Sequence, residues 1–154
     1  MSKIDDRLRE LGLTLPEPGA PVANYVGAVR TGHLVFVSGH GPRPDPDRRY
    51  LGKVGADLDL ETAYRAARVA TLNCLSTLRA AIGDLDRVRR VVKLLGMVNS
   101  APGFREQPKV INGASDLLVD LFGDRGRHAR SAVGMAELPS GIAVEIELIV
   151  EVDD

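Results

Sequence analysis

The sequence predicts an α+β fold in which two main helices pack on one face of a mixed β-sheet. Several segments place apolar residues on alternate positions, which indicates strands with one buried face. Two longer segments repeat apolar residues every three or four positions, which indicates amphipathic helices. The elements run helix, two strands, long helix, strand, helix, two strands, without an internal repeat. This order is typical of helices gathered on one side of a sheet.

Composition limits the classes of protein that the chain can represent. Its 154 residues, 44% of them hydrophobic, suit one domain with a real core. A net charge of −1 and an aromatic content of 4% argue against nucleic acid binding. The N-terminus is charged and no apolar run could span a bilayer, so we expect no membrane partner and a cytoplasmic protein. Cys74, the only cysteine, excludes an intrachain disulfide and is expected in the core.

Residues 1–19 are expected to form an N-terminal helix and a proline-rich extension ahead of a domain over residues 20–154. Ile4, Leu8 and Leu11 have helical spacing, with Ser2 as a candidate N-cap. Prolines between residues 13 and 21 exclude a helix and predict an extended run over the surface.

Residues 25–31 and 33–38 read as a hairpin that turns at Gly32. The second strand is apolar at nearly every position, which predicts cover on both faces. It ends in Ser38-Gly39-His40-Gly41-Pro42, a sequence that either approaches a ligand closely or makes a plain turn, the reading that we favour from these residues alone. The polar loop 43–50 is expected to keep its charges in solvent.

Three further elements follow along the chain. A long helix is predicted from Asp57 or Asp59, either of which can cap it, to Ile82. An interior strand is predicted over 89–99, and a second helix over about 106–122, where Gly123 ends it.

The last thirty residues are predicted to form a second hairpin. From Val144 onward, apolar residues alternate with glutamates, and Leu138-Pro139-Ser140-Gly141 has turn chemistry. Segment 130–137 should then pair antiparallel with this strand and place Arg130 on one face with Glu145 and Glu147. A guanidinium can hold a carboxylate and a glutamate can orient or deprotonate water. The alternative is an ordinary solvated face of a strand.

Sequence motifs for other chemistries are missing. The chain contains no GxGxxG, P-loop, HExxH or GxSxG pattern, so no cofactor or metal is predicted. His33, His40 and His128 lack the spacing of metal ligands. His128 remains of interest because it lies two residues from Arg130.

Several fragments, in order and spacing, resemble the Rid (reactive intermediate deaminase, YjgF-like) family over about residues 20–152. They are Ala20-Pro-Val-Ala-Asn-Tyr25-Val, Val37-Ser38-Gly39, Val110-Ile-Asn112, Ala129-Arg130-Ser131, Leu138-Pro139 and Val144-Glu145-Ile146-Glu147. The resemblance implies a chorismate-mutase-like fold and a homotrimer with its sheets around a central barrel and ligand pockets between subunits. It also implies hydrolysis of enamines and imines, such as 2-aminoacrylate, to 2-keto acids and ammonia without a cofactor.

The same resemblance assigns roles to individual residues. Arg130 matches the arginine that holds the substrate carboxylate, and Glu145 matches the glutamate that positions the hydrolytic water. Tyr25, Ser38, Gly39 and Asn112 match positions that bind substrate or shape the pocket.

The sequence departs from the family pattern by an additional N-terminal helix, by a longer loop at 43–50 and at three replaced positions. Ala132 replaces a common cysteine, His128 replaces a proline, and Ala23-Asn24-Tyr25 replaces Gly-Pro-Tyr.

In the predicted hairpin register, Arg130 and Glu145 are roughly 13 Å apart, which is four strand positions. We therefore expect Arg130 of one subunit to meet Glu145 of its neighbour, with Glu147 as the second choice for orienting water. A non-catalytic protein that binds small carboxylates is the alternative function. RNA cleavage is disfavoured by the neutral charge.

Overall fold

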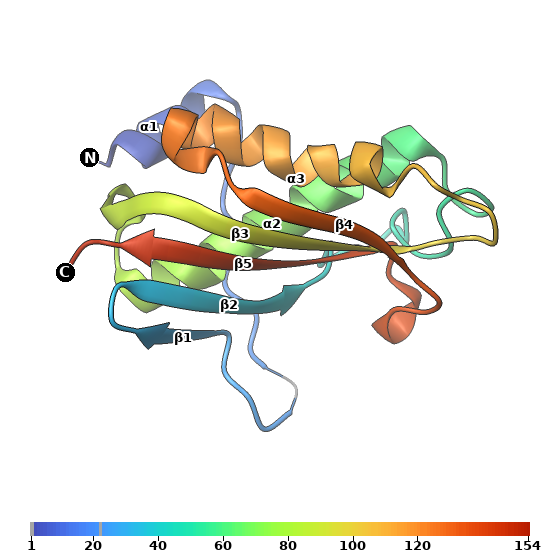
Figure 1. The fold of residues 1–154 in the computed structure, drawn as a ribbon, viewed down its shortest axis with the longest axis horizontal. Coiled ribbons are helices and arrows are strands. Elements are labelled where there is room, and N and C mark those ends of the chain that lie inside the picture. The colour runs from blue at the N-terminus through green and yellow to red at the C-terminus, as the bar shows by residue number, and fades with distance from the viewer. Residues whose placement is uncertain (1, 22) are drawn as a thin grey trace.

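The structure, a computed structural model, describes residues 2–21 and 23–154. Within these residues the chain forms three α-helices, five strands and three short 3-10 turns (Figure 1). The helices and strands are α1 (Lys3–Glu10), β1 (Ala28–Thr31), β2 (Leu34–His40), α2 (Leu60–Ile82), β3 (Val88–Asn99), α3 (Gln107–Phe122), β4 (Ala129–Met135) and β5 (Val144–Val152). This is the predicted element order.

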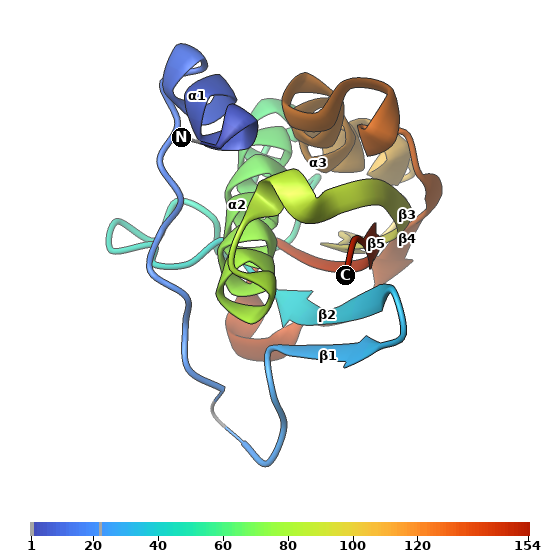
Figure 2. The same cartoon turned by 90° about the vertical axis from the view of Figure 1, so that its left-hand side faces the viewer.

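The strands make one mixed sheet in the order β1-β2-β5-β3-β4. Neighbouring strands are antiparallel except β3 and β4, which run parallel. Helices α2 and α3 pack side by side, α2 against β2 and β5 and α3 against β3 and β4, on one face of the sheet (Figures 1 and 2). The fold class is therefore confirmed, and β3 is interior as predicted.

The predicted hairpin of β4 with β5 is wrong, because β3 lies between them. Residues Pro139–Gly141 form a 3-10 turn in which Ser140 and Gly141 have positive φ. After this turn the chain crosses to the other side of β3, where β5 begins. Alternate residues of β5 are buried, whereas no residue of β4 is. A central place gives β5 hydrogen-bonding partners on both edges, and the partly exposed β4 is left at the sheet edge.

The prediction that β2 is covered on both faces is wrong for the single chain. Val35 and Val37 point toward the helices and are buried, but Phe36 is 43% exposed on the opposite face, called here the open face. Val29 and Val133 lie on the same face, and their side chains are 54% and 39% exposed. Exposed apolar side chains of this kind are frequent at contact surfaces.

Helix α2 begins and ends where the sequence indicates. The Asp59 carboxylate accepts a hydrogen bond of 2.8 Å from the backbone N–H of Thr62, and Gly83, with φ 88°, ends the helix. A Cβ atom at Gly113 would lie 2.0 Å from the carbonyl oxygen of Tyr64, so α3 approaches the α2 backbone closely at this glycine.

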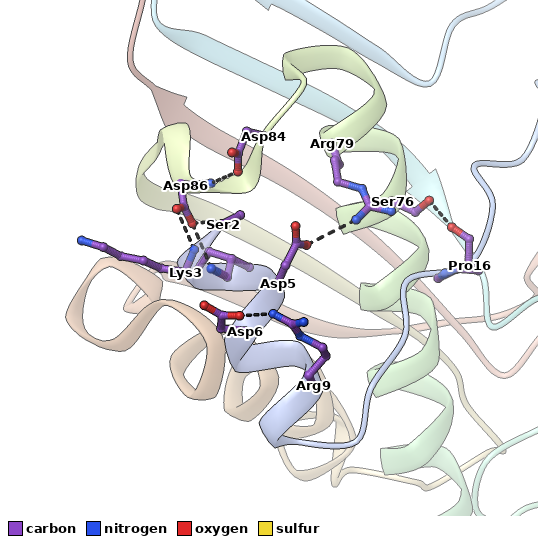
Figure 3. A network of polar contacts seen from close by, with 11 residues as sticks. Ser2, Lys3, Asp5, Asp6, Arg9, Pro16, Ser76, Arg79, Asp84 and Asp86 are labelled. Carbon is purple, nitrogen blue, oxygen red and sulfur yellow. Dashed lines mark hydrogen bonds and ion pairs between the residues drawn. The ribbon is translucent and has the colours of Figure 1, made fainter.

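Helix α1 is held by the carboxylate of Asp86, which follows α2 in the chain. This carboxylate accepts hydrogen bonds from the Ser2 hydroxyl at 2.8 Å and from the backbone N–H groups of Lys3 and Ile4 at 2.8 and 2.9 Å (Figure 3). The hydroxyl of Ser2, the predicted N-cap, makes no hydrogen bond to the backbone N–H groups of the first turn of α1. The extension after α1 is tied to α2 by a hydrogen bond from Ser76 to the carbonyl of Pro16 (Figure 3).

The N-terminal helix shares the hydrophobic core of the sheet and helices. Ile4 and Leu8 are buried within the same cluster as the interior faces of α2, α3 and the sheet. Within the described residues, no helix has both the length and the apolar character needed to cross a membrane.

Candidate functional site

Arg130 lies at the edge of the sheet, beneath α3. It pairs with Leu94 of β3, which pairs with Leu148 of β5, and both leucines are buried beneath the helices. Its Nη1 donates hydrogen bonds to Asn112 Oδ1 at 2.8 Å and Ser115 Oγ at 3.1 Å. Among the described residues no carboxylate pairs with this guanidinium. Arg130 therefore keeps its charge available for an anion.

Glu145 lies on the open face, so the predicted shared face with Arg130 is wrong. It pairs with Met97 of β3, and Met97 pairs with Val133 of β4. Strand β3 separates the two site strands, and two strand spacings amount to about 10 Å. Opposite faces add to this separation. One chain alone does not bring the guanidinium and this carboxylate together.

The carboxylate of Glu145 is half-buried against Gly39. A Cβ atom at Gly39 would lie 2.5 Å from Glu145 Oε1, so the side chain occupies the space that glycine leaves. Burial, and then the negative charge of Glu147, raise the pKa of Glu145. A carboxylate with a raised pKa is a better proton acceptor when it is ionised.

A β-bulge at Ser38 and Gly39 brings Gly39 against Glu145. The β2–β5 register shifts between Val37 and His40, and such an irregularity re-aims side chains. The Ser38 hydroxyl donates to the carbonyl of Val26 at 2.6 Å. The two ring nitrogens of His40 lie 2.5 Å from the Ser38 carbonyl and 2.8 Å from Thr77 Oγ1. Burial lowers the pKa of His40, so the ring that braces this bulge is neutral near pH 7.

A cavity of about 440 Å³ opens at this bulge. Tyr25, Ser38 and Gly39 are among its lining residues. The proline-rich extension forms another wall through residues 17 and 19–21, and Asn73 of α2 a third. Loop residues Arg43 and Pro44 also line it. The sequence did not indicate that the N-terminal extension would reach this cavity.

The predicted site residues thus fall into two groups. Tyr25, Ser38 and Gly39 lie at one end of the sheet with Glu145 beside them, whereas Arg130 and Asn112 lie at β4 and α3. Strands β2 and β4 are three spacings apart, about 14 Å.

Two residues complete the surroundings of Arg130. Ser115 Oγ lies 2.9 Å from His128 Nε2, and His128 Nδ1 lies 2.6 Å from the carbonyl oxygen of Gly126. Burial and the nearby charge of Arg130 lower the pKa of His128, although its bond to Gly126 opposes this shift. Sequence reasoning singled out His128 but missed Ser115. Its position three residues after Asn112, on the same side of α3, was the available signal.

No group of three or more His, Cys, Asp or Glu side chains in the part of the chain described by the structure is arranged to hold a metal ion. Buried Cys74 has its pKa raised by burial and then by the charge of Glu147, so it remains a thiol in the core.

Comparisons with known proteins place this geometry among relatives. A family model described as "YjgF/chorismate mutase-like, putative endoribonuclease" matches residues 5–151. Protein TCP17 of Trypanosoma cruzi is 47% identical over 153 residues, which are 99% of this chain and 96% of that protein.

Two crystal structures superpose closely. Atu1372 from Agrobacterium tumefaciens, a protein of unknown function, is 49% identical to this chain and superposes on it with a TM-score of 0.91. The match covers 98% of this chain and 93% of the Atu1372 chain. A Shewanella oneidensis protein described as a "putative endoribonuclease" is 35% identical and has a TM-score of 0.92. The match covers 97% of this chain and 99% of the Shewanella chain.

Proposed function

This chain belongs to the YjgF/chorismate mutase-like family, and we propose that it hydrolyses small enamines and imines of the 2-aminoacrylate and 2-iminopropanoate type to 2-keto acids and ammonia. One observation carries the proposal. The Arg130 guanidinium is tied to α3 through Nη1 alone, and no acidic side chain among the described residues neutralises it. A planar guanidinium held in this way can take a substrate carboxylate through its remaining N–H groups.

The chemistry needs a water molecule at the carbon of the C=N bond. Glu145, when ionised, accepts a proton from that water as its oxygen bonds to the carbon. The imine nitrogen takes up a proton, which gives a carbinolamine, and 2-aminoacrylate reaches the imine form first by moving a proton from nitrogen to its terminal carbon. The hydroxyl proton of the carbinolamine then passes to the amino nitrogen, the C–N bond breaks as the C=O bond forms, and ammonia and the 2-keto acid are released. This substrate would lie next to Gly39, against which Glu145 packs, and near Ser38 and Tyr25, which line the adjoining cavity. No cofactor is required for these steps.

We infer that a complete site combines two subunits of a homotrimer. Arg130 and Glu145 lie on opposite faces of one sheet, which supports a site that takes the guanidinium from one copy and the carboxylate from another. The exposed Phe36, Val29 and Val133 on the open face supply an apolar surface for such assembly.

Complementation between inactive variants tests the shared site. Arg130→Ala and Glu145→Ala should each reduce ammonia release from 2-aminoacrylate by at least about a hundredfold. Mixed oligomers formed by subunit exchange should regain a clear fraction of wild-type activity, because some sites then contain both intact residues. Each variant exchanged with itself is the control. Verified mixed oligomers without recovery would contradict the shared site.

A non-catalytic protein that binds small carboxylates is the second candidate, because the same Arg130 geometry favours it. It predicts pyruvate binding, lost in Arg130→Ala, without faster ammonia release. RNA cleavage has less support, because the net charge is −1 and the open face carries Glu145, Glu147 and Glu151. An RNA cleavage assay on the same preparations separates this activity.

A further inference from the structure

We propose that His128 is a positioning residue that fixes the orientation of the Arg130 guanidinium through the hydroxyl of Ser115. This inference rests on the proposed function, because it takes Arg130 as the group that holds the substrate carboxylate. His128 lies on the segment before β4, Ser115 on α3 and Arg130 on β4, so three separate parts of the chain meet in one row of hydrogen bonds.

The donors and acceptors leave one consistent direction for this row. Arg130 Nη1 can only donate, so Ser115 Oγ accepts from it at 3.1 Å. The carbonyl of Gly126 can only accept, so His128 Nδ1 carries a hydrogen and donates at 2.6 Å. In a neutral ring Nε2 is then an acceptor, and the Ser115 hydroxyl donates to it at 2.9 Å.

The row fixes where the lone pairs of Ser115 point. A serine hydroxyl whose hydrogen is not held can rotate and turn that hydrogen toward a neighbouring donor. Here His128 holds the hydrogen, so a lone pair stays directed at Arg130 Nη1. Asn112 Oδ1 accepts from the same Nη1 at 2.8 Å. With two acceptors on Nη1, the guanidinium plane is set before a ligand arrives, which lowers the entropic cost of binding a carboxylate.

The charge state of His128 agrees with this direction. Both half-burial and the positive charge of Arg130 favour the neutral ring. A neutral ring lets Ser115 donate to His128, whereas an imidazolium would present a second donor to the hydroxyl.

A serine bonded to a histidine is also the arrangement of a nucleophile and its base. The two roles differ in what they do to kinetics. A positioning role acts on the affinity for the carboxylate, whereas a proton-transfer role acts on the rate of the chemical step.

The first experiment needs no substrate and uses the unmodified full chain. The ¹⁵N chemical shifts of the His128 ring at neutral pH should show hydrogen on Nδ1 and a bare Nε2. A ring with hydrogen on Nε2 would overturn the proposal, because Ser115 would then receive two donors and have none to give to His128.

The second experiment measures pyruvate binding and the kinetics of ammonia release. His128→Ala and Ser115→Ala should each weaken pyruvate binding and raise KM by about three- to tenfold, which is what one hydrogen bond contributes, with kcat little changed. The double variant should lose no more than either single one, because both changes break the same row. His128→Gln, whose amide oxygen can accept from Ser115, should recover part of the loss.

His33→Ala serves as the matched control, because His33 is exposed, faces Asp154 and lies in the β1–β2 turn, three strands away from β4. It should leave pyruvate binding unchanged. Losses that add in the double variant, or a fall in kcat at constant KM, would overturn the positioning role.

The results also separate this inference from the proposed function. Pyruvate binding that depends on His128, without any ammonia release by the wild type, would contradict only the deaminase. A wild type that does not bind pyruvate would overturn the role of Arg130 and this inference together.

Discussion

At the scale of single residues, the two charged groups of the proposed chemistry are controlled by different neighbours. Glu145 is half-buried beside Gly39 and close to a second carboxylate, and both features raise its pKa. Arg130 has amide and hydroxyl oxygens for neighbours and no carboxylate among the described residues. The carboxylate therefore responds to the charge of Glu147, whereas the arginine depends on how its hydrogen bonds are arranged.

Glu147→Gln should shift the pH dependence of ammonia release. The negative charge of Glu147 raises the pKa of Glu145, so removing it lowers that pKa. Because the ionised form is the active one, activity lost on acidification should persist to lower pH in the variant. A pH profile of kcat/KM measures this shift.

Glu151→Gln is the control, because Glu151 is six residues from Glu145 along β5, and it should leave the loss of activity on acidification at the same pH. If kcat/KM also falls at the same acidic pH in Glu147→Gln as in the wild type, Glu145 is not the group that titrates.

At the scale of elements, the packing of α3 against α2 sets the position of Asn112 and Ser115. Gly113 lies between these residues in the chain, and its lack of a side chain lets the two helices approach. Both hydrogen-bonding partners of the Arg130 Nη1 therefore depend on one close helix contact.

Gly113→Ala should weaken the fold and the site together. Its methyl group would meet the Tyr64 carbonyl, and relief requires α3 to move away from α2. We expect a loss of unfolding free energy of about 2 kcal/mol or more, together with weaker pyruvate binding. Denaturant unfolding and calorimetry measure the two effects.

Gly19→Ala is the control for stability, because an added Cβ at Gly19 meets no atom within 4 Å. A Gly113→Ala protein as stable as the wild type would contradict the role assigned to this contact.

Element types followed from local sequence, but strand pairing did not. The caps of α2 and the alternation in β5 are local signals, and the structure has both elements where these signals indicate. The partner of β4 is decided by competition among strands for the sheet centre. The short, partly exposed β4 goes to the edge, and nothing between Arg130 and Glu137 reports that outcome. The predicted face of Arg130 was wrong for this reason, although the arginine itself was identified.

At the scale of the whole molecule, the helices cover one face of the sheet and leave on the other exposed apolar side chains beside the glutamates of β5. Phe36, Val29 and Val133 spread over β2, β1 and β4, so the exposed surface crosses the sheet from one edge to the other. Exposed apolar side chains on one face of a sheet favour the assembly that we propose.

Phe36→Asp should therefore disrupt the oligomer. An unpaired carboxylate is costly inside an interface, so, in the proposed assembly, the variant should elute as a monomer in size exclusion with light scattering. Ammonia release should fall with it, because the proposed site combines residues of two copies.

Arg105→Gln changes the net charge by the same amount in an exposed loop and should leave the mass unchanged. A fully active Phe36→Asp monomer would contradict the shared site.

The anchoring of α1 by Asp86 has a consequence for the range of ligands. The extension that leaves this helix is fastened again at Pro16 and then becomes a wall of the cavity. Changes in the docking of the first dozen residues would reposition that wall while every residue facing the ligand stays the same. Relatives could thus diverge in what they accept through mutations at a site remote from the chemistry.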